Sequence, residues 1–236
     1  MEHKENDNKE SSRRDFIKKS LVVTISGAAG ISLFFGCKEK EGDQKVSPPE
    51  DLMQEHGVLN RILLIYDVCK MHLINKVNFP KETLAGAASI IRTFVEDYHE
   101  KQEEQYLFPR FQKANQLTDL VNTLLQQHQA GRRLTDQILS LTKSPRISEQ
   151  ENHTLIQLLN SFNTMYRPHE AREDTVLFPA FRKIVSRHEY DSLGEEFENN
   201  EHKIFGRDGF ETIVSKVAEI EKKLGIYDLS QFTPQL

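Results

Sequence analysis

The feature that most constrains the fold of this 236-residue chain is a segment of fifteen residues that occurs twice. The segments 99–113 and 169–183 are identical at eight positions, including the first His, the Glu four residues later and a Leu-Phe-Pro run. A weaker repeat, at a shift of 72 residues, aligns His56 with His128. We therefore predict two copies of one helical hairpin, because a repeat of this length is a supersecondary unit.

Apolar residues recur at the spacing of amphipathic helices over most of the chain. Gly (11 residues) and Pro (8 residues) are scarce, and long stretches are rich in Leu, Glu, Gln, Lys and Arg, a composition that favours helices over strands. Short connections imply antiparallel neighbours, so the sequence predicts an all-α fold, an up-down-up-down four-helix bundle with an additional C-terminal helical segment. The predicted helices lie at about 51–75, 81–113, 117–143, 148–187 and 190–224.

Each of the four bundle helices places a histidine on the face that should be buried. On the second and fourth helices the row of apolar residues continues without a break onto a His and the Glu four residues later. On the first and third helices a single His lies in the apolar row. An unpaired ionisable group buried in a core costs several kcal/mol, and metal coordination removes that penalty. The candidate metal ligands are His56, His99, Glu103, His128, His169 and Glu173.

The kinds of side chain in this set limit the metal. A His and a Glu four residues apart on a helix project side by side and can grip one ion. Imidazole and carboxylate together suit iron, manganese or zinc, and no thiolate lies in the motif to favour a softer ion. Two glutamates that face each other across a bundle are also well placed to bridge two ions.

The order of these residues, with Leu-Phe-Pro after each His-x-x-x-Glu pair, resembles the hemerythrin-like, or HHE cation-binding, family over residues of about 51–205. The resemblance implies a four-helix bundle that holds a non-haem di-iron centre, with the four histidines as terminal ligands. Glu103 and Glu173, together with an oxo or hydroxo group, would bridge the two iron ions, and manganese and zinc are the less favoured metals. Members of the family bind or sense dioxygen, handle nitric oxide or peroxide, or supply iron for cluster repair.

The sequence departs from the family at the fifth histidine. Classical members have another His four residues after the one on the third helix, but this chain has Arg132 there, and a guanidinium cannot coordinate a cation. We expect His202, in the C-terminal segment, to replace it as a metal ligand, with His72 as the second choice. If neither binds, one iron is under-coordinated and open to a substrate, which favours reactivity over reversible carriage.

Other residues beside the motif have two interpretations each. Glu100 and Glu170 follow a ligand histidine and point about 100° away from it on a helical wheel, so we expect them to be solvated or to support the ligands from behind. Tyr98 and Tyr166 are expected to fill the core or to hydrogen-bond a bound oxygen species. The phenylalanine of each Leu-Phe-Pro run is expected to wall the site or to pack the bundle end.

The N-terminus carries signals for export rather than for folding. The segment 12–18 matches the twin-arginine signal, and an apolar run follows over 21–35. That run is short for a membrane span, which needs about 20 residues. The Gly-Cys pair after it resembles a lipoprotein cleavage site, so we expect Cys37 to carry a lipid. An uncleaved membrane anchor, or a disulfide between Cys37 and Cys69, is the alternative.

The sequence thus predicts four regions and an exported protein. The twin-arginine route carries folded proteins, so a metal can be inserted before export, and the product would be a periplasmic or cell-envelope lipoprotein. The regions are a signal peptide at 1–36, a flexible tether at 37–50, the hemerythrin-like bundle at 51–187 and a C-terminal helical extension at 188–236 that packs on the bundle.

The charge balance and the motif together rank the possible functions. A formal charge of -5 argues against a nucleic-acid surface, which is usually basic. We expect the chain to bind or sense a small ligand (O2, NO or H2O2) and to contact a membrane through a lipid anchor. The alternatives are a redox enzyme that removes peroxide or NO, a protein that stores or donates iron and, last, a structural zinc-binding bundle.

Overall fold

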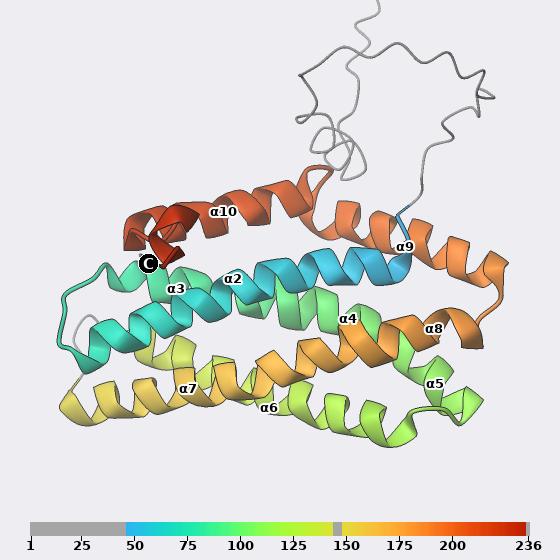
Figure 1. Cartoon of the computed structure of the whole chain (residues 1–236), viewed down its shortest axis with the longest axis horizontal. Helices are drawn as coiled ribbons and strands as arrows, with labels where there is room; N and C mark the ends of the chain where they lie inside the picture. The colour runs from blue at the N-terminus through green and yellow to red at the C-terminus, as the bar shows by residue number, and fades with distance from the viewer. Residues whose placement is uncertain (1–45, 144–147, 235–236) are drawn as a thin grey trace, which may run out of the picture.

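The computed structural model describes residues 46–143 and 148–234, and there the chain is helical with no β-strand. The predicted all-α fold is therefore confirmed (Figure 1). The predicted signal peptide, with its two arginines and the lipidation site Cys37, lies outside the described residues. Within them, no helix is both long enough and apolar enough to span a lipid bilayer.

Four long helices form the bundle, and two of them consist of several segments. The first is α2 (Pro48–Ile74) and the third is α6 (Thr118–Thr142). The second runs through α3 (Lys81–Ile90), η1 (Ile91–His99), α4 (Glu100–Gln102), η2 (Glu103–Leu107) and α5 (Phe108–Ala114). The fourth runs through α7 (Glu149–Arg172), η3 (Glu173–Leu177) and α8 (Phe178–Ile184).

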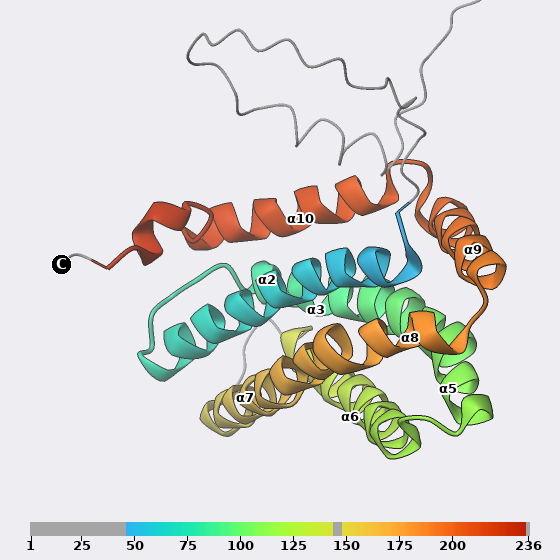
Figure 2. The same ribbon diagram turned by 45° about the vertical axis from the view of Figure 1, so that its right-hand side comes forward.

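The C-terminal segment forms two further helices and a short 3₁₀ turn. Consecutive bundle helices run in opposite directions, and the C-terminal helices lie along the side of the bundle that α2 and α3 form (Figures 1 and 2). The predicted additional helical segment is therefore present and packs on the bundle. These elements are α9 (Arg187–Phe205), α10 (Gly209–Leu224) and η4 (Leu229–Phe232).

Helix α2 begins at Pro48, three residues before the start predicted from periodicity, so residues 48–50 do not belong to the tether. The cause is a capping box. Ser47 is the N-cap, and its backbone N–H donates to the Glu50 carboxylate at 2.9 Å. Proline is also favoured at the first helical position. The run Ser-Pro-Pro-Glu is therefore a sequence signal that predicts the start of this helix.

Both copies of the repeat contain a π-helical turn at the same place. The turn η2 begins at Glu103 and η3 begins at Glu173, and each is followed by the proline of the Leu-Phe-Pro run. Proline has no N–H with which to close an α-helical turn, so the helix widens before Pro109 and Pro179 rather than breaking. The repeated proline thus places a π turn at each of the two candidate glutamate ligands, Glu103 and Glu173.

The core consists of two apolar clusters with a polar layer between them. The larger cluster includes Ile62, Tyr66, Phe94 and Phe162, and α10 packs against it through residues such as Val217. The smaller cluster occupies the other end of the bundle, around the Leu-Phe-Pro runs. Along each of the four bundle helices, the candidate ligands fall between residues of the two clusters. The fold therefore encloses the ligands on both sides.

Candidate metal centre

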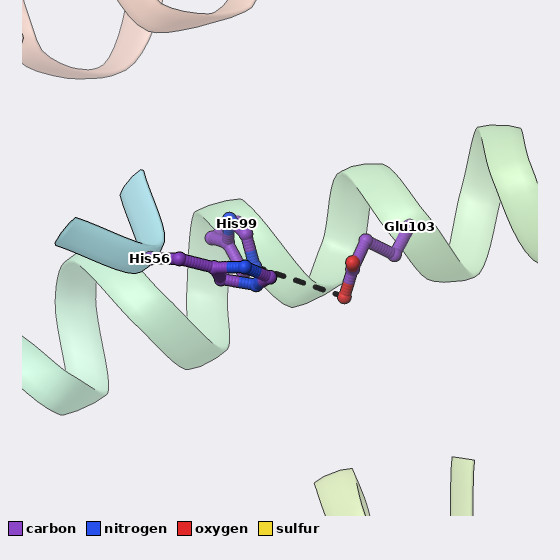
Figure 3. A group of neighbouring side chains, drawn as sticks. All are labelled: His56, His99 and Glu103. Atoms are coloured by element: carbon purple, nitrogen blue, oxygen red, sulfur yellow. Dashed lines mark ion pairs between the residues drawn. The ribbon is translucent and has the colours of Figure 1, made fainter. Parts of the chain in front are cut away.

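The six candidate ligands of the repeat lie together in the polar layer. Each is almost fully buried, with an exposed fraction of 4% or less. They form two groups, and within each group the ligand atoms lie within 4.8 Å of one another. Figure 3 shows the first group, with the side chains from α2 and the second helix directed toward one another. The groups are His56, His99 and Glu103, and His128, His169 and Glu173.

The two glutamates connect the groups. Glu103 Oε2 lies 3.8 Å from Nε2 of His99 in its own group and 3.5 Å from Nε2 of His128 in the other. Glu173 Oε2 likewise lies 3.1 Å from Nε2 of His169 and 3.4 Å from Nε2 of His56. Each carboxylate is thus between histidines of both groups. A pair of bridged metal ions needs this arrangement.

Every histidine of the centre is oriented by a hydrogen bond from its Nδ1 to a side-chain oxygen on the side of the ring away from the centre. These acceptors are oxygen atoms, so each Nδ1–H donates outward, and Nε2 points toward the centre. Metal-ligating histidines are held in this way in proteins generally. The pairs are His56 with Asp174 at 2.8 Å, His99 with Glu55 at 2.7 Å, His128 with Glu104 at 3.1 Å and His169 with Gln127 at 2.9 Å.

The interior of the centre is rich in acceptors and poor in donors. The carboxylate oxygens of Glu103 and Glu173 are buried and accept no hydrogen bond from the described residues. Burial raises the pKa of Glu103 well above its usual range, and the nearby charge of Glu173 raises it further. Carboxylates and inward imidazole nitrogens that face one another repel unless a cation or a proton lies between them. These residues therefore fit a pair of metal ions.

The histidines of the centre differ in how readily they give up a proton. Burial lowers the pKa of His56, but the hydrogen bond to Asp174 and the nearby negative charge of Glu173 outweigh it and raise the pKa to about 10. Burial lowers the pKa of His99, and it lowers the pKa of His128 to about 4. In the metal-free centre two of the imidazoles are thus neutral, whereas the carboxylates around His56 keep on it a proton that a bound metal would replace.

The phenylalanines of the two Leu-Phe-Pro runs wall the centre. Phe178 stacks on the ring of His56, with centroids 5.5 Å apart and an interplanar angle of 18°. Phe108 stacks on His128 at 5.5 Å and 27°. Both phenylalanines are also part of the smaller apolar cluster, so they both pack the bundle end and exclude water from the ligands.

Glu100 and Glu170 are buried, with exposed fractions of 1% and 3%, so the expectation that they are solvated is wrong. Neighbouring helices cover the side of the helix on which they lie. Glu100 accepts a hydrogen bond from the Tyr166 hydroxyl at 2.7 Å, and Glu170 accepts one from the Asn60 amide. Tyr166 is fully buried, and its hydroxyl donates to Glu100. Tyr98 lies in the larger apolar cluster.

Arg132, at the position of the family's fifth histidine, acts as a counter-ion. Its Nη2 lies 2.7 Å from Glu100 and 2.8 Å from Glu104. These two carboxylates and Nδ1 of His128 would otherwise form a third group with the geometry of a metal site. Because the guanidinium already pairs with both carboxylates, this third group is an ion-pair network beside the centre.

The structure does not bring either proposed fifth histidine into the two groups. His202 lies half-buried on α9, and its neighbour Glu201 turns inward instead, where it accepts a hydrogen bond from the Phe210 backbone N–H at 2.7 Å. His72 contacts Phe79 and lies about 24 Å along α2 from His56.

The residues that orient the histidines were not predicted from the sequence, although a signal for them existed. Glu55 and Gln127 correspond at the shift of 72, and each precedes a ligand histidine. Glu104 and Asp174 correspond at the shift of 70, and each follows a ligand glutamate. Polar residues at matched positions of a repeat, next to the ligands, are the pattern that would have identified them.

A comparison with known families decides which family has this centre. The model of the hemerythrin HHE cation-binding domain matches residues 47–181, more than half of the chain. The chain belongs to the hemerythrin HHE cation-binding family. With its two His/Glu groups, this hemerythrin-like chain fits a metal-binding protein.

The similarity of this hemerythrin-like chain to other proteins extends beyond that domain. An uncharacterised protein of Mycobacterium bovis and two of Mycobacterium tuberculosis (strains CDC 1551 and H37Rv) are each 50% identical to it over 231 residues. The matches cover 92% of this chain and 91% of each relative. No solved structure gave a significant match.

Proposed function

We propose that this chain is a non-haem di-iron protein that binds or reacts with O2, NO or H2O2. The observation that carries the proposal is the position of Glu103 and Glu173, each between imidazole nitrogens of both groups. Hemerythrin-like domains typically bind iron, and nitrogen and oxygen donors without a thiolate suit it. The four histidines would be the terminal ligands, and the two glutamates would be the bridges.

The enclosure of the centre supports a ligand of two to four atoms. When bound, a pair of iron ions supplies redox chemistry and an open coordination position for such a ligand. The side chains of Phe108 and Phe178 cover the histidines, and every candidate ligand of the repeat is almost fully buried. Arg132 cannot coordinate, so with four histidines the chain offers fewer terminal ligands than the classical centre does. That difference favours a reactive or ligand-binding centre over a saturated one.

Optical titration of the iron-loaded protein tests this function. Reduced protein should change its visible spectrum when O2, NO or H2O2 is added, because a small ligand can occupy the open position. A change that reverses when the ligand is removed supports a carrier or sensor, whereas consumption of excess peroxide or NO supports a redox enzyme. An iron-loaded protein whose spectrum responds to none of the three would contradict the proposal and favour iron storage or a structural role.

We also propose that the chain is exported by the twin-arginine route and anchored to a membrane through Cys37. The supporting features are the twin-arginine motif and the Gly-Cys pair after the apolar run. The alternative disulfide is disfavoured because Cys69 is a free thiol, fully buried in the larger cluster. Burial raises the pKa of this thiol to about 12, which leaves it unreactive.

Fractionation of cells that express the full chain tests the location. Changing Arg13 and Arg14 together to Lys should keep the protein in the cytoplasm, because the export signal depends on the arginine pair. Cys37→Ser should release the exported protein from the membrane fraction, because it removes the site of the lipid. A Cys37→Ser protein that stays in the membrane would show that residues 21–35 are an uncleaved anchor.

A further inference from the structure

The four groups that orient the histidines follow the internal repeat in position but not in charge. Glu55, which accepts from His99, corresponds to Gln127, which accepts from His169. The same role in the two halves is therefore filled once by a carboxylate and once by a neutral carboxamide. This difference lies next to the centre on helices α2 and α6.

The second pair of orienting groups, Glu104 and Asp174, also differs in charge, and again the half that contains Gln127 has the less negative environment. Glu104, behind His128, shares its charge with two cations, Arg132 at 2.8 Å and Lys101 at 2.6 Å. Its counterpart behind His56 is Asp174, which forms no ion pair with a lysine or arginine in the described part of the chain. The half of the centre that contains Gln127 thus also carries the neutralised carboxylate.

A carboxylate behind a ligand histidine makes the imidazole a better donor to a metal, and loss of such a partner typically costs about 10–100-fold in metal affinity. In position 1, which we define as the group of His56 and His99, carboxylates orient both histidines. In position 2, the group of His128 and His169, one orienting group is neutral and the other is paired with cations.

We propose, on the basis of the di-iron function above, that the two metal positions are unequal. Position 1 binds a divalent metal more tightly and fills first, whereas position 2 fills second and releases its metal more readily. Gln127 and Arg132 set this order. Neither residue is a metal ligand. Gln127 leaves His169 without a carboxylate partner, and Arg132 neutralises the carboxylate that orients His128.

Stepwise titration of the metal-free full-length protein with Co²⁺, followed by calorimetry and visible absorption, tests the order. The wild type should bind in two steps of different affinity. Gln127→Glu should raise the affinity of the weaker step by about 10–100-fold, and Glu55→Gln should lower that of the tighter step by a similar factor. The second change keeps an oxygen acceptor for His99, so it removes the charge without removing the hydrogen bond.

Two further sets of variants assign the steps and control for added charge. His169→Ala should remove the weaker step, and His99→Ala should remove the tighter one. Gln126→Glu adds the same charge as Gln127→Glu, but its side chain is exposed one residue away, and both binding constants should stay within about twofold of wild type. If Gln127 served only to maintain the structure, Gln127→Glu would not raise metal affinity. A gain seen in Gln127→Glu and not in Gln126→Glu therefore supports its role in setting the affinity of the weaker step.

Three results would overturn the inference. These are two equal steps in the wild type, an unchanged weaker step in Gln127→Glu, and the same change in Gln127→Glu and Gln126→Glu. Each of them leaves the di-iron function intact, because both positions still bind metal. Failure of the wild type to bind Co²⁺ at all would instead overturn the proposed function, and this inference with it.

Discussion

Changing both Glu103 and Glu173 to Ala should reduce the iron content of the purified protein from two per chain to less than one. The double change removes the two anionic groups that lie between the histidines, and four neutral imidazoles cannot balance the charge of two ions. Either single change should lose at least one iron. Elemental analysis of protein purified aerobically from iron-replete cells measures the effect.

A matched control distinguishes loss of the bridges from a general effect of removing glutamate. Glu149 is at the start of α7 with an exposed fraction of 90%, so Glu149→Ala should keep both irons. Circular dichroism should show that the double variant is still helical, because the change removes buried carboxylates that accept no hydrogen bond. Retention of both irons by the double variant would contradict the bridging assignment.

Gly131→Ala should destabilise the metal-free protein by about 2–4 kcal/mol, from overpacking and from loss of a buried hydrogen bond. A Cβ atom at this position would lie 2.0 Å from the Tyr166 hydroxyl oxygen. The ring cannot easily move, because it is fully buried and stacks on Phe162 with centroids 4.3 Å apart. Its hydroxyl also donates to Glu100, which would lose that partner.

Gly57→Ala is the control for this prediction. Gly57 is likewise inside a helix, α2, but nothing lies within 4 Å of a Cβ atom added there. This change should stabilise the protein by about 0.5–1 kcal/mol, because alanine loses less backbone freedom than glycine when a helix forms. Urea unfolding monitored by circular dichroism compares the two. Equal stability of Gly131→Ala and the wild type would contradict the packing described for Tyr166.

Periodicity and the repeat were sufficient to predict the helices and to select the six residues that the structure brings together. They succeed because a core histidine must share the phase of its apolar neighbours, so His99 and His169 could be placed from the spacing of residues before them. The π turns were not predicted. A proline inside a helical pattern can break, kink or widen a helix, and the sequence alone does not determine which.

The burial of Glu100 and the orientation of His202 were missed for different reasons. Glu100 lies off the apolar row of its own helix, and its partners Tyr166 and Arg132 come from other helices, which no local pattern reveals. The segment around His202 has few apolar residues, so the buried face of its helix was difficult to predict from the sequence. Leu193, Phe197 and Glu201 are buried at steps of four residues, a row that would have excluded His202.

The most direct test of the two-metal centre is anomalous diffraction from crystals of the purified protein, measured on both sides of the iron absorption edge. We expect two peaks per chain, one between His56 and His99 and the other between His128 and His169. Both should lie within bonding distance of Glu103 and Glu173. A single peak, or a signal at the zinc edge with none at the iron edge, would contradict the assignment of a di-iron centre.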